Sequence, residues 1–196
     1  LGTKWHPFVS LTSYAVNPVI NIVIMLLIII GGIGFFTWED IYLHKFHFKH
    51  YHMQSKVILT TTLCLILLPA VFFFFQDYGN LSGIHRLLAS LFQAVTPRTA
   101  GFNTTDLSML TGASKAMMIL LMLIGGSPSS TAGGMKTTTF ALLLLNVLAT
   151  FQSCDDVTAF GRRIDASVIK NATTIAMMYF ILFFAGGMTI SVYEGL

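Results

Sequence analysis

Residues 96–104 of this 196-residue chain read Thr-Pro-Arg-Thr-Ala-Gly-Phe-Asn-Thr and could surround a bare monovalent cation with peptide oxygens. Selecting such an ion requires several carbonyl oxygens aimed at one axis, where they replace the water shell of the ion. Gly101 has no Cβ and permits the unusual backbone angles that this arrangement needs. Judged alone, these residues fit an external turn better. Their place between a predicted re-entrant helix and a predicted broken inner helix favours an ion-binding strand. We therefore predict one strand of a cation-selective lining at Thr99, Ala100, Gly101, Phe102 and Asn103.

A second polar segment interrupts the apolar stretch between residues 116 and 151. It comprises Gly125, Gly126, Ser127, Pro128, Ser129, Ser130, Thr131, Ala132, Gly133, Gly134, Met135 and Lys136. A continuous helix over residues 115–151 would be about 55 Å long, far more than one membrane crossing needs. The glycines and the proline also make such a helix costly. We therefore predict a broken inner helix over 116–151. Its irregular middle should line a cavity, because irregular backbone at membrane depth is tolerated only there or inside protein. A kink that packs closely through small residues is the alternative.

Two charged side chains adjoin these segments. Lys136 lies at the inner end of the polar interruption, and a fixed ammonium near a cation path raises the barrier to passage. We predict that it helps to hold the path shut; the alternative is an interfacial lysine that extends to the cytoplasm. Arg98 adjoins the predicted lining, and we favour a structural brace, paired with an acid, over a group that repels cations. Asp106 is an acid nearby in sequence.

The elements that must position these residues are apolar helices. The chain is 55% apolar and only 10% charged, with a mean hydropathy of +0.76, whereas soluble domains carry about 25% charged residues. This composition predicts an all-α integral membrane protein and excludes a water-soluble core, a disordered chain and a nucleic-acid-binding protein. Long apolar runs predict membrane-spanning helices over 16–36, 57–75 and 168–192.

A shorter amphipathic segment, residues 84–95, precedes the predicted lining. It is too short to cross a bilayer, so we predict a re-entrant helix that ends before Pro97. Lysines and arginines in the loops 37–56 and 152–167 predict that both loops are cytoplasmic, which makes residues 76–115 external.

An internal repeat organises the chain. The pattern at 55–62 recurs at 167–174, and the Ile-Gly-Gly of residues 30–32 recurs at 124–126. We therefore divide the chain into the end of a preceding repeat (1–54), a complete repeat of outer helix, pore loop and inner helix (55–151), and the start of a following repeat (152–196). This division predicts a piece of a longer, repeated polypeptide.

The motifs at 96–104 and 124–139, together with the Ile-Gly-Gly-Ile-Gly-Phe sequence at 30–35, resemble the third repeat and its flanks in the Trk/Ktr/HKT superfamily of potassium transporters. The resemblance extends over nearly the whole chain and is strongest to the Ktr membrane subunit. It implies four such repeats around one pore, each contributing one filter glycine, here Gly101. It also implies that residues 125–136 form an intramembrane gating loop below the filter.

This resemblance further implies potassium uptake through the plasma membrane, with Na⁺ as a coupling or regulatory ion, no enzymatic activity and no covalently bound cofactor. It implies a homodimer of pore subunits in the lipid bilayer, docked on a cytosolic ring of nucleotide-binding, KtrA-like regulatory subunits. The loops 37–56 and 152–167 are then candidate docking surfaces. No nucleic acid partner is implied.

Three alternatives remain open. The first is a Trk-type potassium transporter subunit with a different regulatory partner. The second is a membrane enzyme that uses a metal held by His44, His47, His50 and His52, although interleaved lysines disfavour it. The third is a non-conducting scaffold. A phosphate-binding loop at 133–137 is strongly disfavoured, because Met135 breaks the required Gly-Lys pair and no β-strand pattern precedes it.

Overall fold

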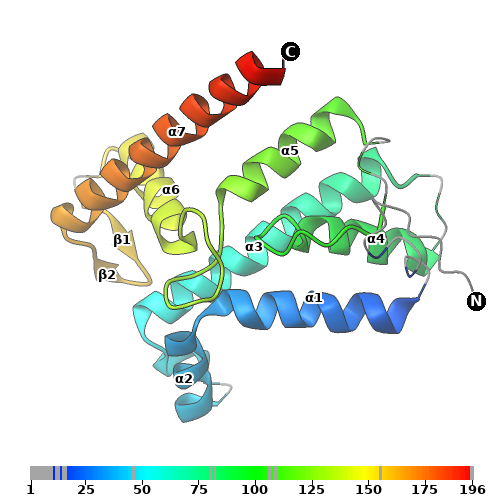
Figure 1. The fold of residues 1–196 in the computed structure, drawn as a ribbon. Coiled ribbons are helices and arrows are strands. Elements are labelled where there is room, and N and C mark those ends of the chain that lie inside the picture. Colours follow the sequence, from blue (N-terminus) through cyan, green and yellow to red (C-terminus); the bar gives the residue numbers. More distant parts are fainter. Residues whose placement is uncertain are drawn as a thin grey trace, which may run out of the picture.

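The computed structural model describes residues 11, 14, 17–45, 47–79, 81, 83–105, 107, 110–154 and 156–194. Helices dominate the described residues, and the predicted all-α fold is confirmed (Figure 1). In chain order the elements are α1 (Pro18–Ile33), α2 (Phe35–His44), a 3-10 turn (Phe48–His50), α3 (Met53–Gln76), α4 (Gly83–Val95), α5 (Gly112–Leu123), α6 (Thr137–Phe151), β1 (Thr158–Ala159), β2 (Arg162–Arg163) and α7 (Ala166–Glu194).

Helix α1 begins at a strong capping signal and ends earlier than predicted. Asn17 Oδ1 accepts two backbone N–H groups, at 3.1 and 3.4 Å, and Pro18 occupies the first turn, where its missing N–H costs nothing. The helix predicted over 16–36 ends at Ile33, because Gly34 adopts a φ of +90° that a right-handed helix cannot contain. The chain bends there by 96° and continues as α2, which points away from α1 in Figure 1.

The segment predicted as the loop 37–56 is largely helical, which corrects that expectation. Helix α2 extends to His44, and α3 already begins at Met53. Both helices continue into the charged segment because Asp40 faces inward, only 3% exposed, and accepts the backbone N–H of His52 at 3.1 Å. That bond satisfies a donor at the start of α3 that a helix leaves unpaired.

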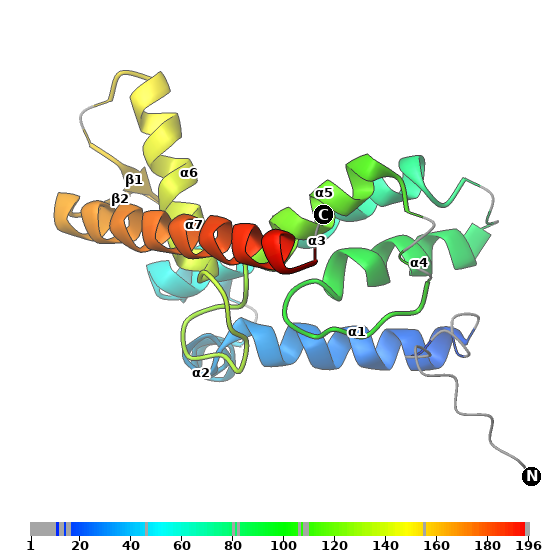
Figure 2. The same cartoon turned by 45° about the horizontal axis from the view of Figure 1, so that its top comes forward.

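The main apolar core lies between α3, α5 and the short amphipathic helix α4. Phe73 of α3 and Ala94 of α4 are fully buried in it, together with Met118 and Leu121 of α5. The opposite side of α4 packs against α1 through Phe92, and Figure 2 shows the two helices next to each other. Helix α4 is thus held between α1 and α3, which fixes the direction in which its C-terminal end points.

The predicted break in the inner helix is present. Helices α5 and α6 are separated by residues 124–136, which contain only an isolated bridge between Ile124 and Met135. Among the described residues, α3 and α7 are the two single helices long and apolar enough to cross a membrane, and α1 with α2 passes as a bent pair.

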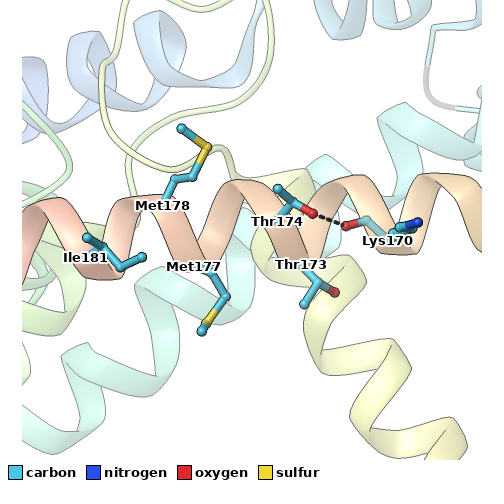
Figure 3. A pocket seen from close by; sticks show the side chains of 6 residues that line it. All are labelled: Lys170, Thr173, Thr174, Met177, Met178 and Ile181. Carbon is cyan, nitrogen blue, oxygen red and sulfur yellow. Dashed lines mark hydrogen bonds between the residues drawn. The ribbon is translucent and has the colours of Figure 1, made fainter.

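Helix α7 packs against α6 and leaves most of its surface uncovered (Figure 2). Its exposed side carries a shallow apolar groove, which Figure 3 shows from close by and which is lined by Lys170, Thr173, Thr174, Met177, Met178 and Ile181. All six residues come from α7 alone, so the groove is a feature of one helix surface and belongs to no enclosed site.

The segment predicted as the loop 152–167 contains a small hairpin that the sequence analysis missed. Strands β1 and β2 pair antiparallel, with Thr158 opposite Arg163. Phe160 and Gly161 connect them, with φ angles of +49° and +77°. Two consecutive residues at positive φ are typical of a type I′ turn. This turn favours a glycine at its second central position, so Gly161 was a sequence signal for the hairpin.

Candidate ion pathway

The segment predicted to line an ion path begins where α4 ends. The N–H of Thr96 donates to Phe92 O at 2.9 Å and continues the helical pattern, after which the N–H groups of Ala100 and Gly101 both donate to Thr96 O, at 3.3 and 3.4 Å. The chain therefore folds back over the end of α4. The Thr96 hydroxyl also donates to the carbonyl oxygen of Phe102, so one buried side chain holds both ends of the segment.

The backbone of this segment alternates in handedness. Thr99 has a φ of +66° and Gly101 a φ of +74°, whereas Ala100 between them does not have positive φ. A positive φ at a β-branched threonine is strained and persists only where the surroundings impose it. A Cβ at Gly101 would have no atom within 4 Å, so the glycine is required there by its backbone angle and not by crowding.

Two carbonyl groups of the predicted lining already accept hydrogen bonds from protein. Phe102 O accepts the Thr96 hydroxyl, and Asn103 O accepts the N–H of Leu11 at 2.9 Å. The five residues 99–103 are therefore not equivalent, because protein donors occupy acceptor positions on the last two.

A buried polar cluster supports the far end of the segment, and the sequence analysis missed it. Gln93 of α4, 2% exposed, accepts hydrogen bonds at its side-chain oxygen from Thr105 at 3.2 Å and from Tyr78 at 3.4 Å. The hydroxyl groups of Tyr78 and Thr105 are 3.1 Å apart. Burial raises the pKa of the Tyr78 hydroxyl, and the nearby charge of Asp77 adds to this effect, so Tyr78 stays protonated and able to donate. A glutamine in the last turn of the predicted short helix was the available signal.

Arg98 lies beside the lining and is 7% exposed. Within the described part of the chain its Nε and Nη2 atoms are buried and have no hydrogen-bond partner. Asp106, the nearby acid, lies outside the described residues.

The polar interruption of residues 125–136 is a closed loop. At its base the N–H of Gly125 donates to Met135 O at 2.9 Å, and the N–H of Thr137 donates to Gly126 O at 3.1 Å. Inside it, Ser127 is fully buried and its hydroxyl lies 3.0 Å from that of Thr137. These bonds satisfy backbone groups that the broken helix leaves unpaired.

The tip of this loop is bound to the bend between α1 and α2. The N–H of Ser127 donates to Gly32 O at 2.9 Å, and the N–H of Thr131 donates to Gly31 O at 3.4 Å. In the opposite direction, the N–H of Phe35 donates to Ser129 O at 3.1 Å. Segments about 100 positions apart in sequence therefore share one set of backbone hydrogen bonds, and nothing in the local sequence indicates this pairing.

The C-terminal end of the loop is held by two side chains. Lys136, which is partly exposed, donates from Nζ to Ala132 O at 2.8 Å. Tyr179 of α7 donates to Gly134 O at 3.2 Å. The structure thus places the predicted gating loop between the α1–α2 bend and α7, whereas α4 positions the predicted lining.

The four histidines between positions 44 and 52 lie near one another, but they form no metal site among the described residues. The His44 ring lies 6.4 Å from that of His50 and 6.5 Å from that of His52. His52 Nδ1 is instead 2.6 Å from Asp40 Oδ1. These histidines line the junction of α2 and α3.

The fold is that of a helical membrane protein whose inner helix is interrupted by an irregular segment. A family model described as TrkH, a cation transport protein, matches residues 44–195, and the chain belongs to this family.

Curated relatives agree with this assignment. Ktr system potassium uptake protein B of Bacillus subtilis (strain 168) is 35% identical over 191 residues, which cover 94% of this chain and 43% of that protein. Potassium/sodium uptake protein NtpJ of Enterococcus hirae is 35% identical over 190 residues, covering 94% and 42%. The chain therefore spans less than half the length of these relatives. They are uptake proteins, which confirms the prediction that the chain is not an enzyme.

A solved structure is similar in fold. The crystal structure of the potassium transporter TrkH from Vibrio parahaemolyticus superposes with a TM-score of 0.72 at 19% sequence identity, covering 88% of this chain and 39% of that one. At this identity the likeness supports the shared architecture alone.

Proposed function

We propose that the protein carrying this chain takes up potassium ions across the plasma membrane through a selective pore, of which residues 99–103 line one side. The observation that carries the proposal is the alternating backbone at Thr99, Ala100 and Gly101. When left-handed and right-handed residues alternate, successive peptide groups turn so that their carbonyl oxygens can face one axis, as ion coordination requires. The names of the curated relatives support potassium as the ion.

The dipole of helix α4 favours a cation at this place. The C-terminal end of α4, which carries the partial negative charge of the helix dipole, leads directly into the segment. Because the carbonyl groups of Phe102 and Asn103 accept protein hydrogen bonds, the proposal assigns the main ion contacts to Thr99, Ala100 and Gly101.

Residues 125–136 serve in this proposal as the gate below the lining. The loop is irregular, rich in glycine and serine, and closed at its base by only a few backbone hydrogen bonds. Such a segment can change conformation without unfolding the apolar helices on either side. Lys136 adds a positive charge at its inner end, which raises the barrier to a cation while the loop is closed.

Sodium dependence and partners complete the proposal. The name of the Enterococcus hirae relative includes sodium, which supports a role for Na⁺ as a coupling or regulatory ion. We further propose a homodimer docked on a KtrA-like nucleotide-binding ring. Substitution of the exposed charged residues in both loops, 37–56 and 152–167, should then abolish binding of the ring.

The test is growth of a potassium-uptake-deficient cell at low external potassium, with the full-length protein that carries this chain. We expect the wild-type protein to restore growth. Gly101→Ala should reduce uptake and the preference for K⁺ over Na⁺, because alanine resists the φ of +74°. Gly79→Ala is the matched control, since its methyl group meets no atom within 4 Å and its φ is not positive. Failure of the wild-type protein to restore growth would overturn the proposal.

A further inference from the structure

The bend between α1 and α2 deprives carbonyl groups at the end of α1 of the backbone hydrogen bonds that they would accept in a continuous helix. In a straight helix, Ile30 O, Gly31 O and Gly32 O would accept the N–H groups four positions further along. Here Ile30 O accepts the indole N–H of Trp38 at 3.1 Å. Gly31 O and Gly32 O accept N–H groups of the 125–136 loop. The loop and Trp38 therefore supply the hydrogen bonds that the bend removes.

One pair of groups shows that the seated loop and a straight helix exclude each other. Gly31 O and the N–H of Phe35 stand four positions apart and would bond to each other in a continuous helix. In this structure the loop separates them, because Gly31 O accepts the N–H of Thr131 and the Phe35 N–H donates to Ser129 O. Straightening α1 into α2 would withdraw both groups from the loop.

We propose that the bend at Gly34 is the second half of the gate: straightening of α1 and α2 into one helix unseats the 125–136 loop. This inference rests on the proposed function, in which that loop closes the pore. Gly34 is the residue that the bent state requires. Its φ is +90°, and a Cβ there would lie 2.3 Å from the carbonyl oxygen of Pro128. Only a glycine permits both the bend and the close approach of the loop.

Helix α2 is held in the bent orientation by a contact with α3. Asp40 of α2 accepts the His52 N–H at 3.1 Å and the hydroxyl of Ser55, and lies 2.6 Å from His52 Nδ1. Asp40 and Ser55 are each 3% exposed. This clamp lies on the predicted cytoplasmic side, where a regulatory subunit has access to it. Release of the clamp would free α2 to straighten and would thereby open the gate from the cytoplasm.

The first measurement is potassium uptake without activation, in cells that express the full-length protein. Gly34→Ala makes the bend unfavourable and the straight helix favourable, so basal uptake should rise at least about tenfold. Gly187→Ala adds the same methyl group in α7, away from the bend and the loop, where it meets no atom within 4 Å. It should leave basal uptake nearly unchanged. Trp38→Phe removes the indole donor without a backbone clash and should raise uptake in the same direction as Gly34→Ala.

The second measurement is the distance between spin labels at positions 19 and 42 in a background without reactive cysteines. Val19 of α1 is 66% exposed and Tyr42 of α2 is 84% exposed, so both accept a label. A straight helix should separate these positions by about 10 Å more than the 96° bend does. Gly34→Ala should shift the distribution to the longer distance, and Gly187→Ala should not.

The outcomes separate this inference from the proposed function. If the wild-type protein does not transport potassium, the proposed function fails and the inference fails with it. If the wild-type protein transports potassium but Gly34→Ala leaves basal uptake unchanged, or raises it with the labels at the shorter distance, only the inference is overturned. If Gly34→Ala does not reach the membrane, Trp38→Phe decides the matter by the same two measurements.

Discussion

Gly125 and Gly133 touch across the base of the 125–136 loop, where a Cβ on Gly125 would lie 1.6 Å from the carbonyl oxygen of Gly133. Gly125→Ala must therefore push the two sides of the base apart, at a cost of about 1–3 kcal/mol to the closed loop. We expect basal potassium uptake to rise about fivefold or more. Gly133→Ala, whose methyl group meets no atom within 4 Å, should have a clearly smaller effect. Unchanged uptake by Gly125→Ala at normal membrane levels would contradict the role of the closed base.

The hydroxyl of Thr96 controls the shape of the proposed lining. Thr96→Val keeps the side-chain volume but removes the hydrogen bond to Phe102 O. Such a bond is worth about 0.5–1.5 kcal/mol, so the preference for K⁺ over Na⁺ should fall about twofold to tenfold. Competition between the two ions in an uptake assay measures this ratio. Thr60→Val is the control, because the Thr60 hydroxyl donates to Lys56 O on an exposed side of α3. An undiminished ratio for Thr96→Val would show that other contacts shape the strand.

Lys136 combines a charge with a hydrogen bond, and two substitutions separate them. Lys136→Ser removes both the charge and the bond to Ala132 O, and we expect higher potassium flux. Lys136→Gln removes the charge but keeps an N–H donor on a shorter side chain. If the charge forms the barrier, both variants should raise the flux to a similar extent in a tracer assay. A flux equal to that of the wild type in both variants would rule out a gating role for Lys136.

The guanidinium of Arg98 is buried beside the lining, and Nε and Nη2 have no partner among the described residues. We predict that an acid outside the described residues pairs with it in the full-length protein, which makes Arg98 a brace. Arg98→Met should then lower the free energy of unfolding by about 3–5 kcal/mol, because it leaves the acid unpaired. Arg98→Lys should retain part of that stability. Thermal unfolding of the purified protein gives the comparison. A methionine variant as stable as the wild type would mean that no acid pairs with Arg98.

Local patterns in the sequence were enough to predict the apolar helices, the interruption at 125–136 and a short helix over 84–95. Apolar runs, prolines and glycines act through the chain's own backbone, so their effects extend over a few turns at most. The interruption, for example, follows from four glycines and a proline between two apolar runs. The proposed lining at 99–103 was identified from residue types together with its place between a short helix and a broken one, and its role stays a prediction.

Only the tertiary structure decided how these pieces are held. The bend at Gly34 arises from a loop about 100 positions away that binds Gly31 O, Gly32 O and the Phe35 N–H, and no local pattern records such a partner. The support of the lining by Gln93 and Tyr78 is likewise a contact between distant segments. A sequence specifies which backbone groups a helix break leaves unpaired, whereas the packing of the whole chain determines which distant groups come close enough to satisfy them.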